Sequence, residues 1–257
     1  MKPLTAPLSG RRVVVTRPQA QAEGLARLIR EAGGEALRIP VIEIRDLEDP
    51  APFFAIADRL DDFDIAIFVS RNAVRKALAL LGDRPWPARL AVATVGQGSR
   101  EELQAGGFAQ VIAPPSQSDS EALLALPGFA AMRGKRVVIF RGDGGRQMLG
   151  DTLAARGAGV EYAPCYRRVR PDAGEALRGA WATGVDAVTL SSAEGLANFV
   201  EMLGDGAAAR LSAIPLFVPH ARVADEAARR GWGRPIVAGP RDAEMAAALV
   251  AYFGGAG

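Results

Sequence analysis

The sequence predicts an α/β protein built from two parallel sheets. Short apolar runs such as Arg12–Thr16 and Val137–Phe140 have the pattern of strands buried on both faces. Each run is followed by a segment whose apolar residues recur every three to four positions, as in an amphipathic helix. Strands and helices that alternate in this way are typical of parallel sheets covered by helices. The same order of elements then occurs a second time, which indicates two such units.

Composition limits the classes of protein to consider. A chain of 257 residues suits one large domain or two small ones. Its 31 basic and 29 acidic side chains give a net charge of +2, so no basic field predicts a nucleic-acid partner. The single cysteine, Cys165, excludes an internal disulfide and a cysteine-rich metal site. No apolar run has the length of a signal-peptide core or the roughly 20 residues of a membrane span, so we expect a cytoplasmic protein without a membrane partner.

The first half of the chain contains the first copy of the elements. Arg17-Pro18 end the strand Arg12–Thr16, and Gly33-Gly34 stop the next helix before the strand Glu35–Ile39. After the apolar run 64–69, Ser70-Arg71-Asn72 are expected to cap a helix. The remaining elements expected here are an extended segment at 41–46, a helix near 53–60, strands at 90–95 and 109–113, and helices at 100–105 and 121–126.

The second copy begins in the stretch 135–166. The strand Val137–Phe140 is followed by the loop Arg141–Arg146, a helix, and a strand from Val160–Ala163. A glycine-rich turn before a helix offers backbone N–H groups and the positive helix end to an anion, although a tight turn with two solvated arginines explains the same residues. The loop does not match the dinucleotide-binding motif G-x-G-x-x-G, because Gln147 occupies the position of its last glycine. The phosphate-loop motif G-x-x-x-x-G-K-[ST] is absent as well.

Several segments recur at nearly the same distance along the chain, which indicates an internal duplication. The sequence RVVVTR at 12–17 matches RVVIFR at 136–141, and DIAIFVS from Asp64 matches DAVTLSS from Asp186. The segment 90–107 resembles the segment 214–231. Two α/β units favour a ligand beyond the carboxyl ends of the strands.

The loops at those predicted ends contain Ser, Thr, Asn, Gly, Arg and the single histidine, with Asp143 as the one carboxylate. Such a set of donors suits a polyanion. The loops are Thr16-Arg17, Ser70-Arg71-Asn72, Gly96–Ser99, Arg141–Arg146, Ser191-Ser192 and Pro219–Arg222.

Most individual candidates have a plain structural explanation as well. His220 has no clustered ligand partners, so a metal site is not expected, and it either caps a loop or faces an acidic ligand as a cation. The G-x-S-x-G elbow of Ser–His–Asp hydrolases is absent. Tyr166 is either an edge-strand residue that covers a linker or a phenol that donates a proton in the cleft. Ser191 and Ser192 are most simply helix N-caps.

The motifs together resemble the uroporphyrinogen-III synthase family and cover nearly the whole chain in the family's order. Two positions depart from the G-x-x-T pattern of many members, because Ser99 and Val223 stand where the family has threonine, and His220 or Arg222 is expected to substitute. The segments that carry the resemblance are VVVTRP (13–18), IFVSRNAV (67–74), TVGQGSREELQAGGF (94–108), SDSEALLALP (118–127), the stretch 135–168, VTLSSAEGL (188–196) and VPHARVADEAARRG (218–231).

The resemblance implies two flavodoxin-like parallel-sheet domains joined by a two-stranded linker. One domain is expected to be discontinuous, from residues 1–39 and 168–257, and the other inserted, from 41–165. The linker would be Pro40–Arg45 and Tyr166–Arg170, and the strand–helix–strand of 135–163 would complete the inserted domain. This arrangement replaces a simple succession of two repeats.

The resemblance also implies a reaction, the cyclisation of hydroxymethylbilane with loss of water and inversion of the last pyrrole ring. The expected partner is this linear tetrapyrrole polycarboxylate, no cofactor or metal is required, and the enzyme is expected to be a monomer. Tyr166 is the predicted catalytic proton donor to the departing hydroxide. The predicted substrate-binding residues are Arg17, Ser70, Asn72, Gly96, Ser99, Arg141, Gly142, Arg146, Ser191, Ser192, His220 and Arg222.

Two other functions are compatible with the fold. A non-catalytic two-domain sensor of a small acidic metabolite is the first, although the chain has no spare segment for a DNA-binding helix-turn-helix. A nucleotide-dependent enzyme is the second, and the failed glycine motifs oppose it.

Overall fold

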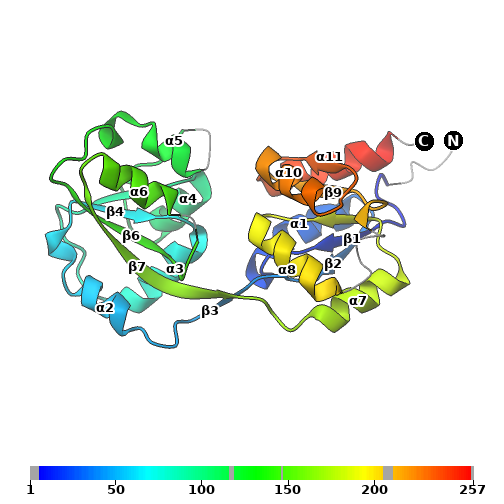
Figure 1. The fold of residues 1–257 in the computed structure, drawn as a ribbon, viewed down its shortest axis with the longest axis horizontal. Coiled ribbons are helices and arrows are strands. Elements are labelled where there is room, and N and C mark those ends of the chain that lie inside the picture. Colours follow the sequence, from blue (N-terminus) through cyan, green and yellow to red (C-terminus); the bar gives the residue numbers. More distant parts are fainter. Residues whose placement is uncertain (1–5, 116–118, 146, 205–210, 256–257) are drawn as a thin grey trace. The chain divides into compact units, whose positions relative to one another are not determined.

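The computed structural model describes residues 6–115, 119–145, 147–204 and 211–255, which form two compact units (Figure 1). Unit 1 lies within Met1–Glu43 and Val169–Gly257, and unit 2 is the continuous segment Ile44–Arg168. Each unit has a five-stranded sheet. The chain passes between the units in β3 (Glu43–Arg45) and β7 (Gly159–Val169), which are neighbouring strands of one sheet.

The sheet of unit 1 has the order β10-β9-β8-β1-β2, and its strands pair in parallel. Numbered along the chain this is the 2-1-3-4-5 order of flavodoxin-like folds. Its strands are β1 (Arg12–Val15), β2 (Glu35–Arg38), β8 (Ala187–Thr189), β9 (Leu216–Val218) and β10 (Pro235–Val237).

Helices cover both faces of this sheet (Figure 1). The helix α1 packs against α11 on one face, while α8 packs against both α7 and α10 on the other. The helices are α1 (Gln19–Glu31), α7 (Gly174–Thr183), α8 (Ala193–Leu203), α10 (Ala221–Arg229) and α11 (Asp242–Gly254). The first of these was predicted, whereas α7 and α11 have no counterpart among the predicted elements.

The sheet of unit 2 has the order β3-β7-β6-β4-β5. The parallel series β7-β6-β4-β5 corresponds to β2-β1-β8-β9 of unit 1, so β6, α6 and β7 hold in unit 2 the place that β1, α1 and β2 hold in unit 1. The remaining elements are β4 (Ile65–Phe68), β5 (Ala91–Thr94), β6 (Arg136–Gly142), α2 (Ala51–Ala57), α3 (Arg71–Leu81), α4 (Gln97–Ala105), α5 (Ser120–Leu124), α6 (Met148–Ala155) and two short 3-10 turns at 60–62 and 127–129.

Both faces of β6 are buried, as its continuous apolar sequence predicts. Val138 and Phe140 join the core under α2 and α3, while Val137 and Ile139 join the core under α5 and α6. The predicted fold class, an α/β protein with two flavodoxin-like parallel sheets, is confirmed.

Three predicted boundaries are wrong. The strand expected at 109–113 is reduced to an isolated bridge between Ala93 and Ile112, since the prolines at 114 and 115 have no N–H to extend the ladder. Arg141 and Gly142 belong to β6 and not to the following loop, because they continue its pairing with β7. The residues expected to form a turn at 96–99 open α4, which begins at Gln97.

The duplication extends to matching side-chain contacts. The carboxylate of Asp64, before β4, accepts a 2.8 Å hydrogen bond from the backbone N–H of Arg136, at the start of β6. Asp186, before β8, accepts a bond of the same length from the N–H of Arg12, at the start of β1. In both units an acidic residue therefore ties together the amino ends of the two central strands.

The Asp64 contact predicts an acid-dependent stability. The N–H of Arg136, aided by the ammonium of Lys135, lowers the pKa of the Asp64 carboxyl. A carboxyl whose folded pKa is lowered stabilises the fold above its ordinary pKa of about 3.9, and that contribution disappears as the pH falls through the folded value. Asp64→Asn should therefore be less stable than the natural sequence at pH 7, and the difference should vanish in strong acid.

Urea unfolding at neutral pH and at about pH 2.5 measures this difference. The effect should be modest, because the Asp64 side chain is 41% exposed. Asp83→Asn, in the exposed loop after α3, is the matched control and should unfold like the natural protein at both pH values. A deficit of Asp64→Asn that is equally large in acid would contradict the explanation.

Candidate functional site

Four predicted site residues lie at or near the carboxyl ends of four neighbouring strands in the sheet of unit 2. Ser70 follows β4, Gly96 follows β5, Gly142 ends β6, and Tyr166 lies in β7. Because β7, β6, β4 and β5 are consecutive neighbours in the sheet, these positions adjoin. The sequence motifs predicted this grouping, and the strand order accounts for it.

Tyr166 makes the most specific contact of the group. Its phenol oxygen lies 3.2 Å from Oγ of Ser70, and either hydroxyl can be the donor. Ser70 is also the N-cap of α3, as predicted, and its Oγ accepts a 3.0 Å bond from the N–H of Ala73. The aromatic ring lies against Gly142, where an added Cβ would be 2.7 Å from Cε2 of the ring. Tyr166 is only 3% exposed, so the phenol is held in one orientation.

Arg141 is placed differently from the surface position that its sequence context suggests. The residue is 9% exposed, and its guanidinium donates to the carbonyl of Gly144 in its own loop. The same guanidinium lies 4.8 Å from the centroid of the Tyr162 ring. Arg141 thus stabilises the loop after β6. Part of its guanidinium is engaged by the Gly144 carbonyl and the Tyr162 ring and is not free to bind a ligand. Arg146 lies outside the described residues.

The other predicted residues of unit 2 lie at helix starts. Gly96 is the N-cap of α4 and supplies no side chain, and the first turn of α4 has no acidic residue. Ser99, in that turn, is 6% exposed. Asn72 lies in the first turn of α3 and is half-buried. The dipole at the start of α4 favours an anion. The N–H groups of Ser99 and Arg100 are bonded to the Gly96 carbonyl, and the Arg71 guanidinium lies against Gly98, where it adds a positive charge.

In unit 1, Ser192 and Arg17 both engage neighbouring residues. Ser192 is the N-cap of α8, as predicted, and accepts a 3.0 Å bond from the N–H of Gly195, while Ser191 is exposed. Arg17 forms an ion pair with Asp242, the first residue of α11.

The N-cap of α10 is His220, which is half-buried and makes no side-chain capping bond. Arg222 is exposed in the first turn of that helix, which has no acidic residue, so this helix start resembles that of α4. Val223 is fully buried, and its side chain belongs to the core.

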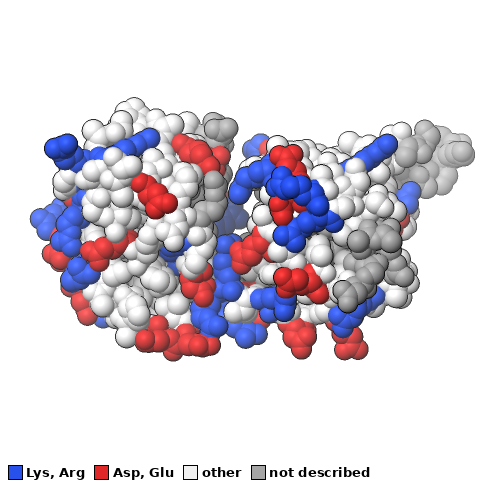
Figure 2. Space-filling model, in the orientation of Figure 1, with Lys and Arg blue, Asp and Glu red and all other residues white. Residues whose placement is uncertain are grey.

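Charge on the surface is mixed in sign. Figure 2 shows Lys and Arg side chains interspersed with Asp and Glu on the face that it draws. At the end of α10, for example, Arg229 and the C-cap residue Arg230 both pair with Glu226. Binding of an anion therefore depends on the local donors described above.

Cys165 lies beside Tyr166 but is buried at 1% exposure. Burial raises the pKa of its thiol to about 12. Because the thiolate is the nucleophilic form, we expect no reaction of the folded protein with iodoacetamide at about pH 8, and complete alkylation in urea. Mass spectrometry of both samples measures the outcome, and rapid alkylation of the folded protein would show that Cys165 is accessible.

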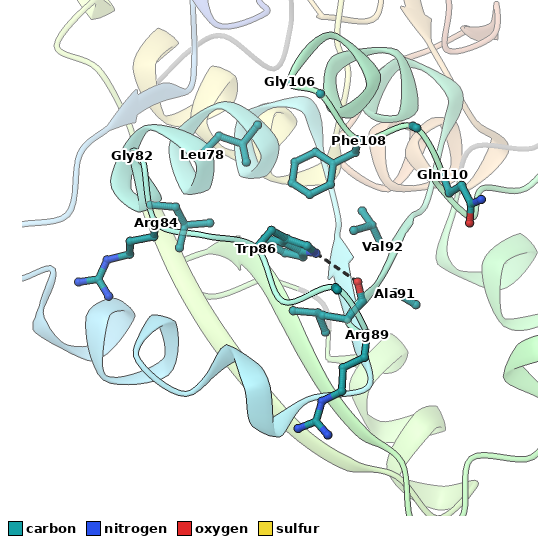
Figure 3. Close-up of a pocket in the computed structure, with 15 residues that line it drawn as sticks. Leu78, Gly82, Arg84, Trp86, Arg89, Ala91, Val92, Gly106, Phe108 and Gln110 are labelled. Atoms are coloured by element: carbon teal, nitrogen blue, oxygen red, sulfur yellow. Dashed lines mark hydrogen bonds between the residues drawn. The ribbon is translucent and has the colours of Figure 1, made fainter.

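A cavity of about 840 Å³ lies at the opposite end of β5 (Figure 3). Trp86 and Phe108 face each other edge to face at 4.9 Å, and the indole N–H of Trp86 donates to the carbonyl of Leu90. Both arginines of the lining are engaged, Arg84 with the Asp58 carboxylate and Arg89 with the Asp61 carbonyl.

In unit 1 the equivalent place is filled by Trp232, whose indole N–H donates to Ile214, the counterpart of Leu90. The cavity of unit 2 is therefore a looser version of a packed region, remote from the carboxyl ends of the strands. Among the described residues, no group of three or more His, Cys, Asp or Glu side chains is arranged to hold a metal ion. The helices within the described ranges also include none that is long and apolar enough to cross a membrane.

The sequence and the fold of this chain are similar to those of one family of known proteins. The family profile described as uroporphyrinogen-III synthase HemD matches residues 23–248. A uroporphyrinogen-III synthase of Salmonella typhimurium is 35% identical over 192 residues, which are 71% of this chain and 76% of that protein. One from Escherichia coli is 34% identical over 158 residues, which are 61% of this chain and 64% of that protein.

Solved structures show the same fold. A mutant uroporphyrinogen III synthase of the extremely thermophilic bacterium Thermus thermophilus superimposes with a TM-score of 0.65 at 17% identity, covering 93% of this chain and 97% of that one. The uroporphyrinogen-III synthetase of Helicobacter pylori gives a TM-score of 0.58 at 16% identity, covering 94% and 99%.

Proposed function

Because this chain belongs to the uroporphyrinogen-III synthase family, we propose that it catalyses the reaction for which the family is named. It cyclises hydroxymethylbilane, a linear tetrapyrrole, with inversion of the last pyrrole ring and loss of water. The family and the names of the relatives support this function in tetrapyrrole biosynthesis. The observation that carries the proposal for this chain is the pairing of Tyr166 and Ser70 at the carboxyl edge of the unit 2 sheet.

The reaction requires a proton donor and groups that bind the carboxylates of the substrate. The C–O bond of the substrate breaks, hydroxide leaves as water, and an electrophilic azafulvene remains. The substituted carbon of the last ring attacks this azafulvene to form a spiro intermediate, whose fragmentation and recombination invert that ring and close the macrocycle. The Tyr166 phenol supplies the proton to the leaving hydroxide, and Ser70 orients it. The start of α4 has no acidic side chain, and the Arg71 guanidinium lies against its Gly98. This positive helix end holds a substrate carboxylate, so that the substrate adopts the shape that leads to the spiro carbon.

Unit 1 carries its own set of predicted carboxylate-binding residues. Ser191, Ser192, His220 and Arg222 offer hydroxyl, imidazole and guanidinium groups to further carboxylates, and Arg17 does so when it leaves Asp242. The domains are residues 1–39 with 168–257 and residues 41–165, and the two compact units support this division. We place the enzyme in the cytoplasm as a monomer that needs no cofactor.

The first test supplies purified protein with freshly generated hydroxymethylbilane. The products are oxidised, and the type I and type III uroporphyrin isomers are separated chromatographically. Mainly type III product, without an added cofactor, is the expected result. Only type I product at the rate of a protein-free control would reject the proposal, and a sensor of a small acidic metabolite would then be the better explanation.

Tyr166→Phe tests the proton donor, because it removes the phenol oxygen and keeps the ring against Gly142. Loss of a general acid typically lowers a rate by roughly a hundredfold or more, so we expect that fall in kcat with little change in KM. Tyr162→Phe is the matched control in the same strand. Its hydroxyl lies 3.5 Å from the Gln147 carbonyl, and this variant should keep its rate. Full turnover by Tyr166→Phe would remove Tyr166 from the mechanism.

A further inference from the structure

The orientation of Tyr166 depends on an irregularity in the pairing of β6 with β7. Arg141 pairs with Pro164, but the next residue, Gly142, pairs with Tyr166, so Cys165 is an extra residue in the ladder. Side chains of a regular strand alternate between the two faces of the sheet. Here Cys165 and Tyr166 are adjacent in sequence and yet both belong to the same core cluster. The bulge therefore turns Tyr166 to the face where Ser70 lies.

Asp143 holds the strand just beyond this bulge. Its backbone N–H donates to the carbonyl of Tyr166 at 2.8 Å, and its Oδ1 accepts a 2.9 Å bond from the N–H of Arg168. Its Oδ2 lies 3.8 Å from Nε of Arg167. The strand β6 ends at Gly142, so no further backbone carbonyl of β6 is in place for the N–H of Arg168. The side-chain carboxylate of Asp143 accepts this hydrogen bond in its place.

The negative charge of Asp143 argues for a structural role and against contact with the substrate. It is an exposed carboxylate at an edge that otherwise carries donors, where it would repel an acidic substrate. Its contacts are directed to the three residues 166–168 of β7. These contacts fix the shifted register on the far side of the bulge.

We propose that Asp143 is a positioning residue, which keeps β7 in its shifted register and thereby holds the Tyr166 phenol against Ser70. The inference rests on the proposed function, because Tyr166 is there the proton donor. Asp143 itself has no contact with the reacting atoms in this mechanism. Its effect on the rate should therefore require the Tyr166 hydroxyl.

The test compares Asp143→Ala and Asp143→Asn, each in the natural sequence and in Tyr166→Phe. Misplacing a catalytic group slightly lowers a rate by roughly ten- to a hundredfold, so Asp143→Ala should lower kcat by about tenfold or more. Asn keeps an oxygen that accepts the Arg168 N–H, so Asp143→Asn should restore most of the rate. In Tyr166→Phe, Asp143→Ala should cause no further loss, because the hydroxyl that it positions is absent.

Amide hydrogen exchange provides a measurement that does not depend on activity. The Arg168 N–H should exchange faster in Asp143→Ala than in the natural protein, and Asp143→Asn should retain protection. Asp151→Ala is the control, since it also removes an exposed carboxylate, here from the first turn of α6. It should change neither exchange at Arg168 nor the rate.

Two results would overturn the inference. One is natural exchange at Arg168 together with full activity in Asp143→Ala. The other is an equal loss of rate from Asp143→Ala in both backgrounds, which would mean that Asp143 acts independently of the phenol. If the natural protein makes no type III product, the proposed function fails, and exchange at Arg168 still decides whether Asp143 holds the strand.

Discussion

Gly142→Ala is expected to remove most of the type III synthase activity and to destabilise unit 2. A Cβ at this position would lie 2.7 Å from Cε2 and 2.9 Å from Cζ of Tyr166, closer than carbon atoms approach in folded proteins. The ring is buried and its hydroxyl is bonded to Ser70, so it has no free space into which to move. Overpacking of a core of this kind costs about 1–3 kcal/mol.

Isomer analysis of the products and urea unfolding measure the two effects of Gly142→Ala. Gly128→Ala is the matched control in the same unit, because an added Cβ there meets no atom within 4 Å. This control should keep the natural rate and stability. Natural activity in Gly142→Ala would mean that the position of the Tyr166 ring is unimportant for turnover, and the proposed role of the phenol would fall with it.

Phe140→Ala is expected to cause the largest loss of stability. Phe140 is fully buried in β6, stacked on Phe68 with ring centroids 4.7 Å apart and tilted against Phe53 at 5.9 Å. Truncation of a buried phenylalanine costs about 3–5 kcal/mol, because the transfer free energy is lost and a cavity remains. That is a large part of the roughly 5–15 kcal/mol by which a typical domain is stable.

The loss from Phe140→Ala should be concentrated in unit 2. Amide hydrogen exchange should accelerate in β4 and β6 and much less in β1 and β8, because the latter belong to a separate core. Tyr252→Ala, at a site 47% exposed in unit 1, is the control and should change the urea midpoint much less. A small effect of Phe140→Ala would show that α2 and α3 can collapse into the vacated space.

Several strands could be predicted because their signals are local, whereas the arrangement of the two sheets was implied by the family resemblance. Continuous apolar runs indicated β1, β4 and β6, and the Ser70 and Ser192 side chains marked the starts of α3 and α8. The repeat indicated β8, β9 and α10, whereas β10, α7 and α11 were not predicted. The uroporphyrinogen-III synthase family, predicted from the motifs, is confirmed.

Features that depend on pairing between distant segments could not be predicted. The bulge at Cys165 arises from the pairing of β6 with β7, and no local sequence pattern in either strand predicts it. Arg17 follows a strand, as expected, but its partner Asp242 stands at the start of the last helix. Asp143 was recognisable only as the exception among donors, because its role depends on the N–H of Arg168. For the site, the sequence thus predicted which residues gather at the strand ends but not which way they face.

The insertion of unit 2 between the two segments of unit 1 also determines the order in which the chain can fold during its synthesis. Unit 2 is one continuous segment, so all of its strands have left the ribosome once Arg168 has emerged. The strand β1 can meet β2 early, but its other neighbour, β8, is made only after the whole of unit 2. Unit 2 can therefore fold before β1, α1 and β2 can pair with the remaining strands of unit 1. The residues that follow unit 2 in the chain then complete the sheet to which β1 belongs.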